Sequence, residues 1–584
     1  MLNLLEKTSV LYYNKKEVIY MKREGNVWQE HLLDENKVYE YPECSMFSYF
    51  KKTAEPHMDY YAIEFEGKKT TYRKLISEIE KTAKALVNIG VKKGDCVSII
   101  SVNTPEVLEM IYAANRIGAI VNMIHPLLSP NDIETFIKTT NSSVVLILDQ
   151  IYPKISKIQW DEIGAPRIIL TRIIDSLPTH IKPVYAMMNR KKASLNPKHN
   201  CIYWKNFISD CDGKGINLPI DDGKMDDVAM IMYSGGTTGT PKGVMLTNLN
   251  INSYSIQAFE VSGIERPEGK KFLAILPLFH GFGFASGIHA NLCKGVHIYL
   301  VAKFEFVKSI QLIFKKKINF IYAVPALFEA LIRSPEIEGD LSFLECLICG
   351  GDKLQKRLYD KLNKYLETGN SKAVFCEGYG QTECVAACLT NPYFAINSES
   401  VGILLPDTSA KIVKIGTQDE VPNGTDGELC ICGPTVMKGY YNNEKETALV
   451  LQKHNDGRVW LHTGDAFCRD DDGYFYFRQR ISRMVISAGY NIYVTQVEKA
   501  ITSCLAVAQC CVVGVEDKVL GHRIRAHVVL NDPAADKAVV REKILEECRN
   551  QLPEYSLPHE IRFCDSLPQT NLGKVDFKAL EQEV

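Results

Sequence analysis

Residues 233–244 read YSGGTTGTPKGV, and this stretch decides how the rest of the chain is interpreted. Its glycines let a backbone wrap closely around an anion, while its hydroxyl groups and Lys242 add hydrogen-bond donors and positive charge. A Walker loop needs the order G-x-x-x-x-G-K-[ST], but here Pro241 precedes the lysine and Gly243 follows it. The stretch therefore predicts a phosphate-binding loop outside the P-loop class of nucleoside triphosphatases.

Strand-like and helical patterns alternate around this loop. Residues 228–233, VAMIMY, form a buried strand that leads into the loop, and residues 73–90 carry apolar side chains at helical spacing. Further buried strands are predicted at 95–102, 144–149 and 167–170. Such alternation predicts an α/β fold in which helices cover parallel sheets.

The chain is long enough for more than one domain, since it has 584 residues. We expect a large domain over 1–479, whose last part is β-rich from about residue 411 onward. Residues 480–584 contain helical and strand-like segments of a small α+β domain. No role is assigned to the residues before about 40.

Composition excludes several function classes. The formal net charge is −2, so the surplus of positive charge that nucleic-acid binding needs is missing. The 18 cysteines are scattered, which favours a reducing compartment. Cys346 and Cys349 form a CxxC inside a predicted buried strand, so neither a redox nor a zinc role is expected for them. No apolar run suits a signal peptide or a membrane span, which predicts a cytoplasmic protein.

Residues 181–192, IKPVYAMMNRKK, allow two interpretations. A helix here would place Ile181, Tyr185 and Met188 on one face beside a basic cluster. One interpretation is a peripheral contact with a membrane surface. The favoured interpretation is an exposed helix end on a soluble protein.

Several segments together resemble one family. YSGGTTGTPKGV resembles the phosphate-binding signature of the acyl-adenylate-forming superfamily, which includes acyl-CoA synthetases, luciferases and the adenylation domains of peptide synthetases. Among these, the motifs are most similar to those of fatty acyl-CoA synthetases. The other segments that resemble the family follow in the expected order: LPLFHGFGF at 276–284, GYGQTE at 378–383, GELCICGPTVMKGYYNN at 427–443, HTGD at 462–465, RQRISRMVISAGYNIYVTQVE at 478–498 and PQTNLGKV at 568–575.

The resemblance implies a reaction in two steps. A carboxylate attacks the α-phosphate of ATP to give an acyl-AMP and pyrophosphate, and a thiol then displaces AMP to give a thioester. The first step brings two anions together, so positive charge must offset their repulsion. The resemblance assigns this role to Lys574 in a small mobile C-terminal domain, because the family's lysine lies between the carboxylate and the α-phosphate.

The resemblance also assigns residues to the nucleotide. Thr382 would contact the α-phosphate, and Glu383 with Thr237 would hold Mg²⁺, which prefers carboxylates and phosphate oxygens. Tyr379 would stack on adenine, and Asp465 would bind the ribose hydroxyls with help from Arg480. The other residues expected to bind ATP are Ser234, Gly235, Gly236, Thr238, Gly239, Thr240, Lys242, Gly351, Asp352, Glu377, Gly380 and Gln381.

The segment that joins the two domains departs from the family pattern. Ser482 stands at the hinge position, where relatives more often carry Asp or Lys, and Gln479 and Arg483 also differ from the common residues. The family rotates its small domain between the two steps. Gly489 resembles the glycine beside the tunnel that admits the pantetheine arm of coenzyme A, where a side chain would obstruct the thiol.

The acyl segment bears on the substrate. Amino-acid-activating relatives usually place an aspartate after the position of His280 to pair with the α-ammonium, but this chain has Gly281 there. An unpaired ammonium would carry a large desolvation cost, so an amino acid is disfavoured. His280 is interpreted either as a gate of the acyl pocket or as a packing residue. Side chains expected around an apolar tail are Phe279, Phe282, Phe284, Val324, Ala326 and Leu327.

A medium- or long-chain fatty acid is the leading substrate, and an aryl or sterol-type acid remains open. Coenzyme A is the leading acceptor, because the chain carries no visible carrier-protein domain; a separate acyl carrier protein is the alternative. A non-catalytic nucleotide-binding protein would need a broken catalytic set, and the candidate residues Lys574, Glu383, Thr382, Asp465 and Arg480 are all present.

Overall fold

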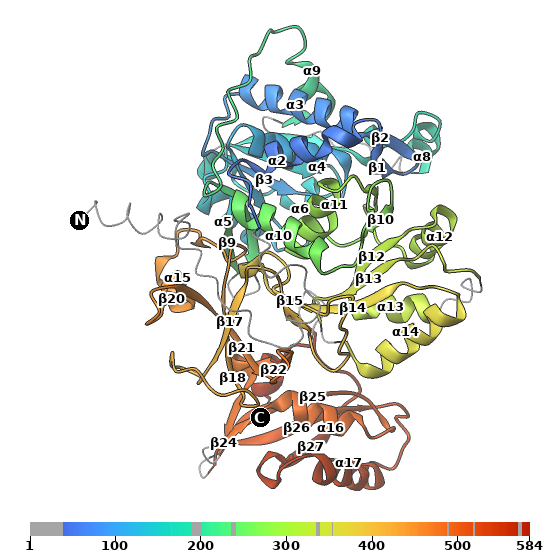
Figure 1. Cartoon of the computed structure of the whole chain (residues 1–584), viewed down its shortest axis with the longest axis vertical. Helices are drawn as coiled ribbons and strands as arrows, with labels where there is room; N and C mark the ends of the chain where they lie inside the picture. Colours follow the sequence, from blue (N-terminus) through green and yellow to red (C-terminus); the bar gives the residue numbers. More distant parts are fainter. Residues whose placement is uncertain are drawn as a thin grey trace.

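The structure, a computed structural model, describes residues 39–164, 166–188, 201–234, 241–333, 339–352, 354–487, 490–517, 520–569 and 575–583 of the 584-residue chain. Two helix-covered sheets form the upper part of the molecule, a β-rich part adjoins them, and the C-terminal residues form a separate unit at the bottom (Figure 1). The predicted α/β fold with a small α+β unit is therefore confirmed.

The first sheet has the strand order β19-β9-β8-β4-β3-β5-β6-β7. From β8 to β7 all neighbours in this order are parallel, since helices connect the strands across the sheet faces. Its strands are β3 Cys96–Ile100, β4 Ile120–Met123, β5 Val144–Leu148, β6 Arg167–Thr171, β7 Cys201–Tyr203, β8 Val228–Ser234, β9 Lys242–Thr247 and β19 Gly439–Tyr440. The helices of this part are α2 Met46–Ala54, η1 Glu55–His57, α3 Tyr72–Asn88, α4 Pro105–Arg116, α5 Pro130–Thr139, α6 Tyr152–Ile155, η2 Trp160–Ile163, α7 Ile173–Ser176, α8 Lys182–Met188 and α9 Trp204–Ser209.

The second sheet has the order β16-β15-β14-β13-β12-β10-β11-β1-β2, and its strands from β14 to β1 are parallel neighbours. The strands are β1 Tyr61–Phe65, β2 Lys68–Thr71, β10 Lys271–Ala274, β11 His297–Leu300, β12 Phe320–Ala323, β13 Cys346–Cys349, β14 Val374–Tyr379, β15 Leu389–Thr390 and β16 Ile403–Leu404. The helices are α10 Asn248–Glu260, the π-helix η3 Phe282–His289, α11 Ala290–Leu292, α12 Phe306–Lys316, α13 Pro325–Arg333, α14 Lys356–Thr368 and the short 3₁₀ turn η4 Thr382–Cys384. Cys346 and Cys349 are both buried in β13, as the sequence predicts.

The β-rich part is an antiparallel sheet with the order β17-β18-β21-β20, and β22 also pairs with β21. Its strands are β17 Ser409–Val413, β18 Gly427–Cys432, β20 Leu451–Lys453, β21 Val459–Arg469 and β22 Phe475–Arg480, and the helix α15 Glu444–Val450 precedes β20. The pairing of β18 with β21 is irregular, because Glu428 lies opposite Ala466 while Cys430 lies opposite His462. One residue of β18 therefore faces three of β21, which makes a bulge at 463–465.

The C-terminal unit packs two helices on a three-stranded sheet, with β25 antiparallel and β27 parallel to the central β26. Its interior is a cluster of its own, built around Ile501, Ile524 and Ile544. The elements are η5 Ile481–Arg483, β23 Val485–Ser487, β24 Tyr490–Ile492, α16 Val494–Thr502, β25 Val507–Asp517, β26 Gly521–Leu530, α17 Lys537–Gln551, η6 Glu554–Ser556, β27 Glu560–Phe563 and α18 Phe577–Glu581.

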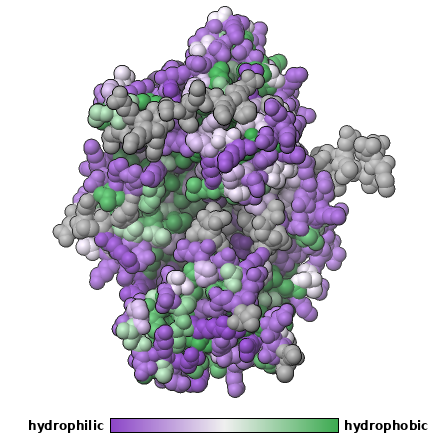
Figure 2. Space-filling model, turned by 180° about the vertical axis from the view of Figure 1, so that it is seen from behind, coloured by the Kyte–Doolittle hydropathy of each residue, from purple (hydrophilic) through white to green (hydrophobic). Residues whose placement is uncertain are grey.

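The surface of the molecule is mostly hydrophilic, and the rear face is hollowed near its middle, with hydrophobic residues inside the hollow (Figure 2). Within the described ranges, every helix is too short or too polar to cross a bilayer. Ile181, directly before α8, and Tyr185 within it are partly buried and pack against the main core. Two of the three residues that the membrane contact would use are thus partly covered by the core, while Val184 and Met187 are exposed.

Candidate active site

Three of the predicted site segments lie partly outside the described residues: Gly235 to Thr240, Gly489 and Lys574. Their neighbours are described. Ser234 ends β8 and pairs with Lys242 at the start of β9, so the glycine-rich loop joins two antiparallel strands of the first sheet. Gln569 and Val575 form an antiparallel bridge on either side of the segment that contains Lys574.

Tyr379 and Asp465 meet where the second sheet touches the β-rich part. Tyr379 ends the parallel strand β14, and its hydroxyl donates to Oδ2 of Asp465 at 2.6 Å. Its ring packs edge-on against Phe467, with the ring centroids 4.7 Å apart. Asp465 is 3% exposed, and this burial raises the pKa of its carboxyl, an effect partly offset by the positive charge of Arg480.

The bulge in β21 positions Asp465. Glu428 on β18 accepts a hydrogen bond from the Gly464 N–H at 3.1 Å and pairs with the ring of His462. The Thr463 hydroxyl accepts from the Asp465 N–H at 3.2 Å. Across the strand pair, Asp465 lies opposite Arg480 of β22, whose Nε is 3.8 Å from Oδ1. Asp465 and Arg480, which the sequence predicts to act together, are thus neighbours across the strand pair.

Glu383 lies in a second cluster that reaches back to the glycine-rich loop. It is 7% exposed, and its Oε1 accepts a hydrogen bond from the Tyr440 hydroxyl at 2.9 Å. The Tyr440 ring also lies under the ammonium of Lys242, 5.0 Å from the ring centroid, and the same ammonium pairs with Glu446. Tyr440 therefore contacts both Lys242, at the end of the glycine-rich loop, and Glu383, the acid predicted to hold a metal.

A strained turn follows Glu383. Val385 has φ +69° and ψ −66°, and the Ala386 N–H donates to the Cys384 carbonyl at 2.9 Å, which defines a γ-turn. Such a backbone is an outlier for a β-branched residue and costs about 1–3 kcal/mol. The turn packs directly against two glycines, where any side chain would clash. A Cβ at Gly281 would lie 1.6 Å from the Val385 carbonyl oxygen, and one at Gly380 would lie 1.8 Å from the Ala386 carbonyl oxygen.

The remaining predicted nucleotide residues follow the carboxyl ends of β13 and β14. Gly351 has φ +81° in the loop after β13, and Asp352 is exposed beside it. The Glu377 carboxylate accepts from the Leu354 N–H at 3.0 Å, which ties this loop to β14. Thr382 starts η4, and Gln381 precedes it with a buried side-chain amide nitrogen that has no partner among the described residues. Ligands of open α/β sheets bind at such carboxyl ends.

His280 is exposed in the middle of the acyl segment and lies beside two other rings. Its ring centroid is 4.9 Å from that of Phe279 and 6.3 Å from that of His125. Phe282 stacks on Tyr322, with centroids 6.2 Å apart. The expectation that Phe284 surrounds an acyl tail is wrong, because this ring is fully buried and contacts Tyr112 and His289 in the main core.

Three residues near the predicted site were given no role by the sequence. Asn103 accepts from the Leu278 N–H and donates to the Leu276 carbonyl, so it holds the acyl segment in place. His125 follows β4, and burial lowers the pKa of its imidazole. Tyr440 was contained in a recognised motif but received no role. A position directly after a buried strand was the available signal for His125; the others required the tertiary contacts.

Comparison with known proteins identifies the family. An AMP-binding enzyme domain matches residues 50–441, and an AMP-binding enzyme C-terminal domain matches residues 496–574. The chain belongs to the AMP-binding enzyme family. Within this family it is an acid–thiol ligase that works through an acyl-adenylate, acting on an acyl or aryl acid.

The curated relatives cover nearly the whole chain. A long-chain-fatty-acid–CoA ligase of Bacillus subtilis is 31% identical over 93% of this chain and 95% of its own length. A long-chain-fatty-acid–CoA ligase of Escherichia coli is 29% identical over 92% and 94%. A probable 4-coumarate–CoA ligase of Dictyostelium discoideum is 30% identical over 86% and 88%.

Solved structures confirm the fold. ATP-bound MatB from Rhodopseudomonas palustris superposes with a TM-score of 0.77 at 23% identity, covering 93% of this chain and 99% of that chain. The anthranilate CoA ligase AuaEII in complex with anthranoyl-AMP gives a TM-score of 0.75 at 20% identity, covering 94% and 98%. The predicted superfamily and the predicted fold class are both confirmed.

Proposed function

We propose that this enzyme activates a medium- or long-chain fatty acid. The carboxylate attacks the α-phosphorus of ATP and pyrophosphate leaves, giving acyl-AMP; the thiol of coenzyme A then displaces AMP to give acyl-CoA. The observation that carries the substrate class is the position of Gly281. Its Cα faces the Val385 carbonyl so closely that only glycine fits, so no acidic side chain can stand there to pair with an amino acid's ammonium.

Fatty acids are favoured over aryl acids by the relatives and by the apolar surroundings. Two of the most similar curated relatives are named long-chain-fatty-acid–CoA ligases. Phe282 stacks on Tyr322. A Cβ added to Gly350 would lie 3.3 Å from the Phe282 ring, and one added to Gly351 would lie 3.6 Å from the exposed Val324. Relatives and structural neighbours that act on 4-coumarate, anthranilate and benzoate keep an aryl acid as the alternative, and a sterol-type acid also remains open.

We assign the nucleotide to the edge formed by Tyr379, Asp465 and the glycine-rich loop. The Tyr379 ring offers a face for adenine, and the Asp465 carboxylate accepts the ribose hydroxyls, with Arg480 next to it. The loop from Ser234 to Thr240 and Lys242 contact the phosphates, and Thr382 contacts the α-phosphate. In this assignment Lys242 exchanges its contact with Glu446 for a phosphate when ATP binds.

Glu383 is the residue that we propose to hold Mg²⁺. One buried carboxylate beside a phosphate site matches the preference of Mg²⁺ for one or two carboxylates together with phosphate oxygens. The Tyr440 hydroxyl orients the carboxylate from one side. The ion would neutralise charge on the phosphates; Thr237, the second proposed ligand, lies outside the described residues.

We propose that Lys574 supplies the charge that offsets the repulsion between the carboxylate and the α-phosphate. It lies in the C-terminal unit, which we take to begin at residue 480. Arg478 pairs with Asp426 of the large body at 2.8 Å, whereas Arg483 pairs with Glu498 of the small unit at 2.6 Å. These two pairs support a boundary between Arg478 and Arg483, and Ser482, exposed between these anchors, is the proposed hinge.

Coenzyme A is the proposed acceptor, with Gly489 beside the path of its thiol. The relatives named CoA ligases support this choice, and an acyl carrier protein is the alternative. A cytoplasmic location remains our expectation.

A carboxylate panel tests the proposal. The purified enzyme is given ATP, Mg²⁺ and fatty acids of increasing chain length, benzoate, 4-coumarate, a bile acid and leucine, and pyrophosphate release is measured. Thioester formation is then compared with coenzyme A and with a holo acyl carrier protein. We expect release with long-chain acids and thioester with coenzyme A. Higher specificity for an aryl acid would refute the substrate class, and no release with any acid would favour a non-catalytic nucleotide-binding protein.

A further inference from the structure

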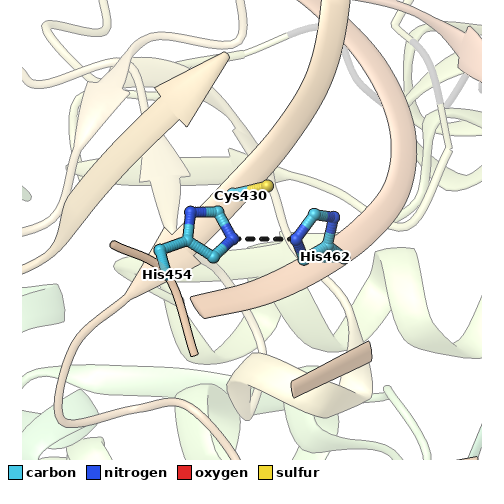
Figure 3. A group of neighbouring side chains, drawn as sticks. All are labelled: Cys430, His454 and His462. Carbon is cyan, nitrogen blue, oxygen red and sulfur yellow. Dashed lines mark hydrogen bonds between the residues drawn. The ribbon is translucent and has the colours of Figure 1, made fainter. Parts of the chain in front are cut away.

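Three potential metal ligands converge inside the β-rich sheet, and none of them is among the proposed ATP or acyl contacts. They are Cys430 on β18, His454 in the turn after β20 and His462 on β21, and all three are buried. One ligand atom of each lies within 4.8 Å of the others. The two imidazoles turn their Nε2 atoms toward each other, and the Cys430 sulfur lies beside the space between them (Figure 3).

The sheet itself sets this arrangement. Cys430 and His462 are directly opposite each other on β18 and β21, so their side chains emerge on the same face. His454 is brought in by the tight turn that joins β20 to β21, closed by the His454 N–H donating to the Arg458 carbonyl at 2.9 Å. The three residues are therefore held by backbone pairing and not by a loose surface loop.

A carboxylate sets the proton of one imidazole. Glu428 Oε2 is 3.0 Å from Nδ1 of His462, so that nitrogen carries the proton and Nε2 presents a lone pair. This lone pair faces Nε2 of His454 at 3.0 Å. A carboxylate behind a ligating histidine is a common feature of protein metal sites, where it fixes the tautomer and strengthens the ligand.

We propose that Cys430, His454 and His462 bind a Zn²⁺ ion. Zinc prefers tetrahedral nitrogen and sulfur ligands, and bonds of about 2.0–2.1 Å place two such nitrogens about 3.3 Å apart. The nitrogens are 3.0 Å apart, so the rings need to separate by only a few tenths of an ångström. One Zn²⁺, one thiolate and the Glu428 carboxylate sum to zero charge in this buried place. On binding, the thiol proton is released and the proton of His454 moves from Nε2 to Nδ1, so both imidazoles bind as neutral ligands.

The site also touches the nucleotide edge. Glu428 accepts from the Gly464 N–H with its other oxygen, and Gly464 precedes Asp465 in the bulge. An ion on His462 would polarise the ring that Glu428 holds. We expect Zn²⁺ to stiffen the β18–β21 junction and to raise the thermal unfolding midpoint, because a ligand that binds only the folded state stabilises it.

Cobalt substitution tests the site on the full-length protein after treatment with a chelator. One equivalent of Co²⁺ should give visible d–d bands of a tetrahedral ion and a near-ultraviolet thiolate-to-cobalt band, and Zn²⁺ should displace both. The Cys430→Ser variant should lose the thiolate band, and His454→Ala should weaken Co²⁺ binding at least tenfold. Cys564→Ser and His522→Ala, in the C-terminal unit, are the matched controls and should bind like the original protein.

A thiolate band that persists in Cys430→Ser, or unchanged binding by His454→Ala, would overturn the proposal. If Cys430→Ser fails to fold, as judged by circular dichroism, His454→Ala carries the decision, since this histidine lies in a turn. Failure of Co²⁺ to bind the original protein would leave a plain hydrogen bond between the two histidines and refute the site. Pyrophosphate release measured without added Zn²⁺ keeps this outcome separate from that of the proposed ligase function.

Discussion

The nucleotide edge and the hinge are neighbours in sequence but are built in opposite ways. Tyr379 and Asp465 are held by hydrogen bonds, a strand bulge and ring packing from several elements. In the hinge, Arg480 and Ser482 are exposed. Arg480 still lies opposite Asp465, and the ion pairs of Arg478 and Arg483 hold the chain on either side. In the proposed mechanism, the large body is therefore prepared for ATP in advance, whereas the C-terminal unit changes its position.

The largest expected effect is at Lys574 in the C-terminal unit. In Lys574→Ala, acyl-AMP formation should fall by about 10²–10³-fold, because one charge-stabilising contact of the transition state is lost. The second half-reaction, from preformed acyl-AMP and coenzyme A, should retain most of its rate. Pyrophosphate release and thioester formation measure the two steps separately. Lys578→Ala, which removes a nearby exposed charge, is the control; equal loss in both steps would contradict the assigned role.

At the nucleotide edge, Asp465→Asn should raise the KM for ATP by about 10- to 100-fold, because hydrogen bonds to a charged acceptor contribute about 1.5–3 kcal/mol to binding. Tyr379→Phe keeps the ring and removes only the hydroxyl donor, so its effect should be smaller, about two- to tenfold. Initial rates at varied ATP measure both. Asp472→Asn, an exposed acid in the turn between β21 and β22, is the control. An unchanged KM in Asp465→Asn would remove this residue from the nucleotide site.

The pH dependence sharpens the same assignment. Burial raises the pKa of Asp465, and only the carboxylate accepts ribose hydroxyls, so kcat/KM for ATP should decline on acidification at a higher pH than an ordinary aspartate would allow. For folding the sign is opposite: the folded state binds this proton more tightly, so the group's contribution to stability is lost as pH rises through its folded pKa. Asp465→Asn should lack this acid limb, and an identical profile would contradict the assignment.

The smallest effect is expected at the hinge anchor. Arg483→Ala removes the ion pair with Glu498, a partly exposed contact worth up to about 1 kcal/mol, so rates should change by less than about fivefold. The change should fall on thioester formation more than on pyrophosphate release, because in the proposed mechanism only the second step uses the rotated C-terminal unit. Lys543→Ala is the control. An effect confined to pyrophosphate release would argue against a hinge at this position.

Local patterns were sufficient for most of the fold. Apolar spacing predicted the helix α3 and the buried strand β8 before the glycine-rich loop. The order of the motifs was sufficient for the family. These features depend on residues close together in the chain or on short segments with a fixed order, which a single sequence displays directly.

Long-range contacts were beyond such patterns. The Tyr440–Glu383 hydrogen bond joins residues 57 positions apart, and the γ-turn at Val385 depends on two glycines from different segments. The Cys430–His462 pairing depends on the register of β18 against β21, which the bulge changes. The burial of Phe284 was missed for the same reason, since the sequence alone did not reveal which side of the π-helix meets the core.

The bulge at 463–465 also separates folding from recognition. Because β21 has two residues more than β18 at this point, shortening it by two would restore an even ladder between the strands. Such a deletion would remove the loop that carries Asp465 while leaving the sheet able to close. We expect a chain of this kind to keep its architecture but to bind the ATP ribose more weakly, because Asp465 would no longer lie beside Tyr379 and Arg480.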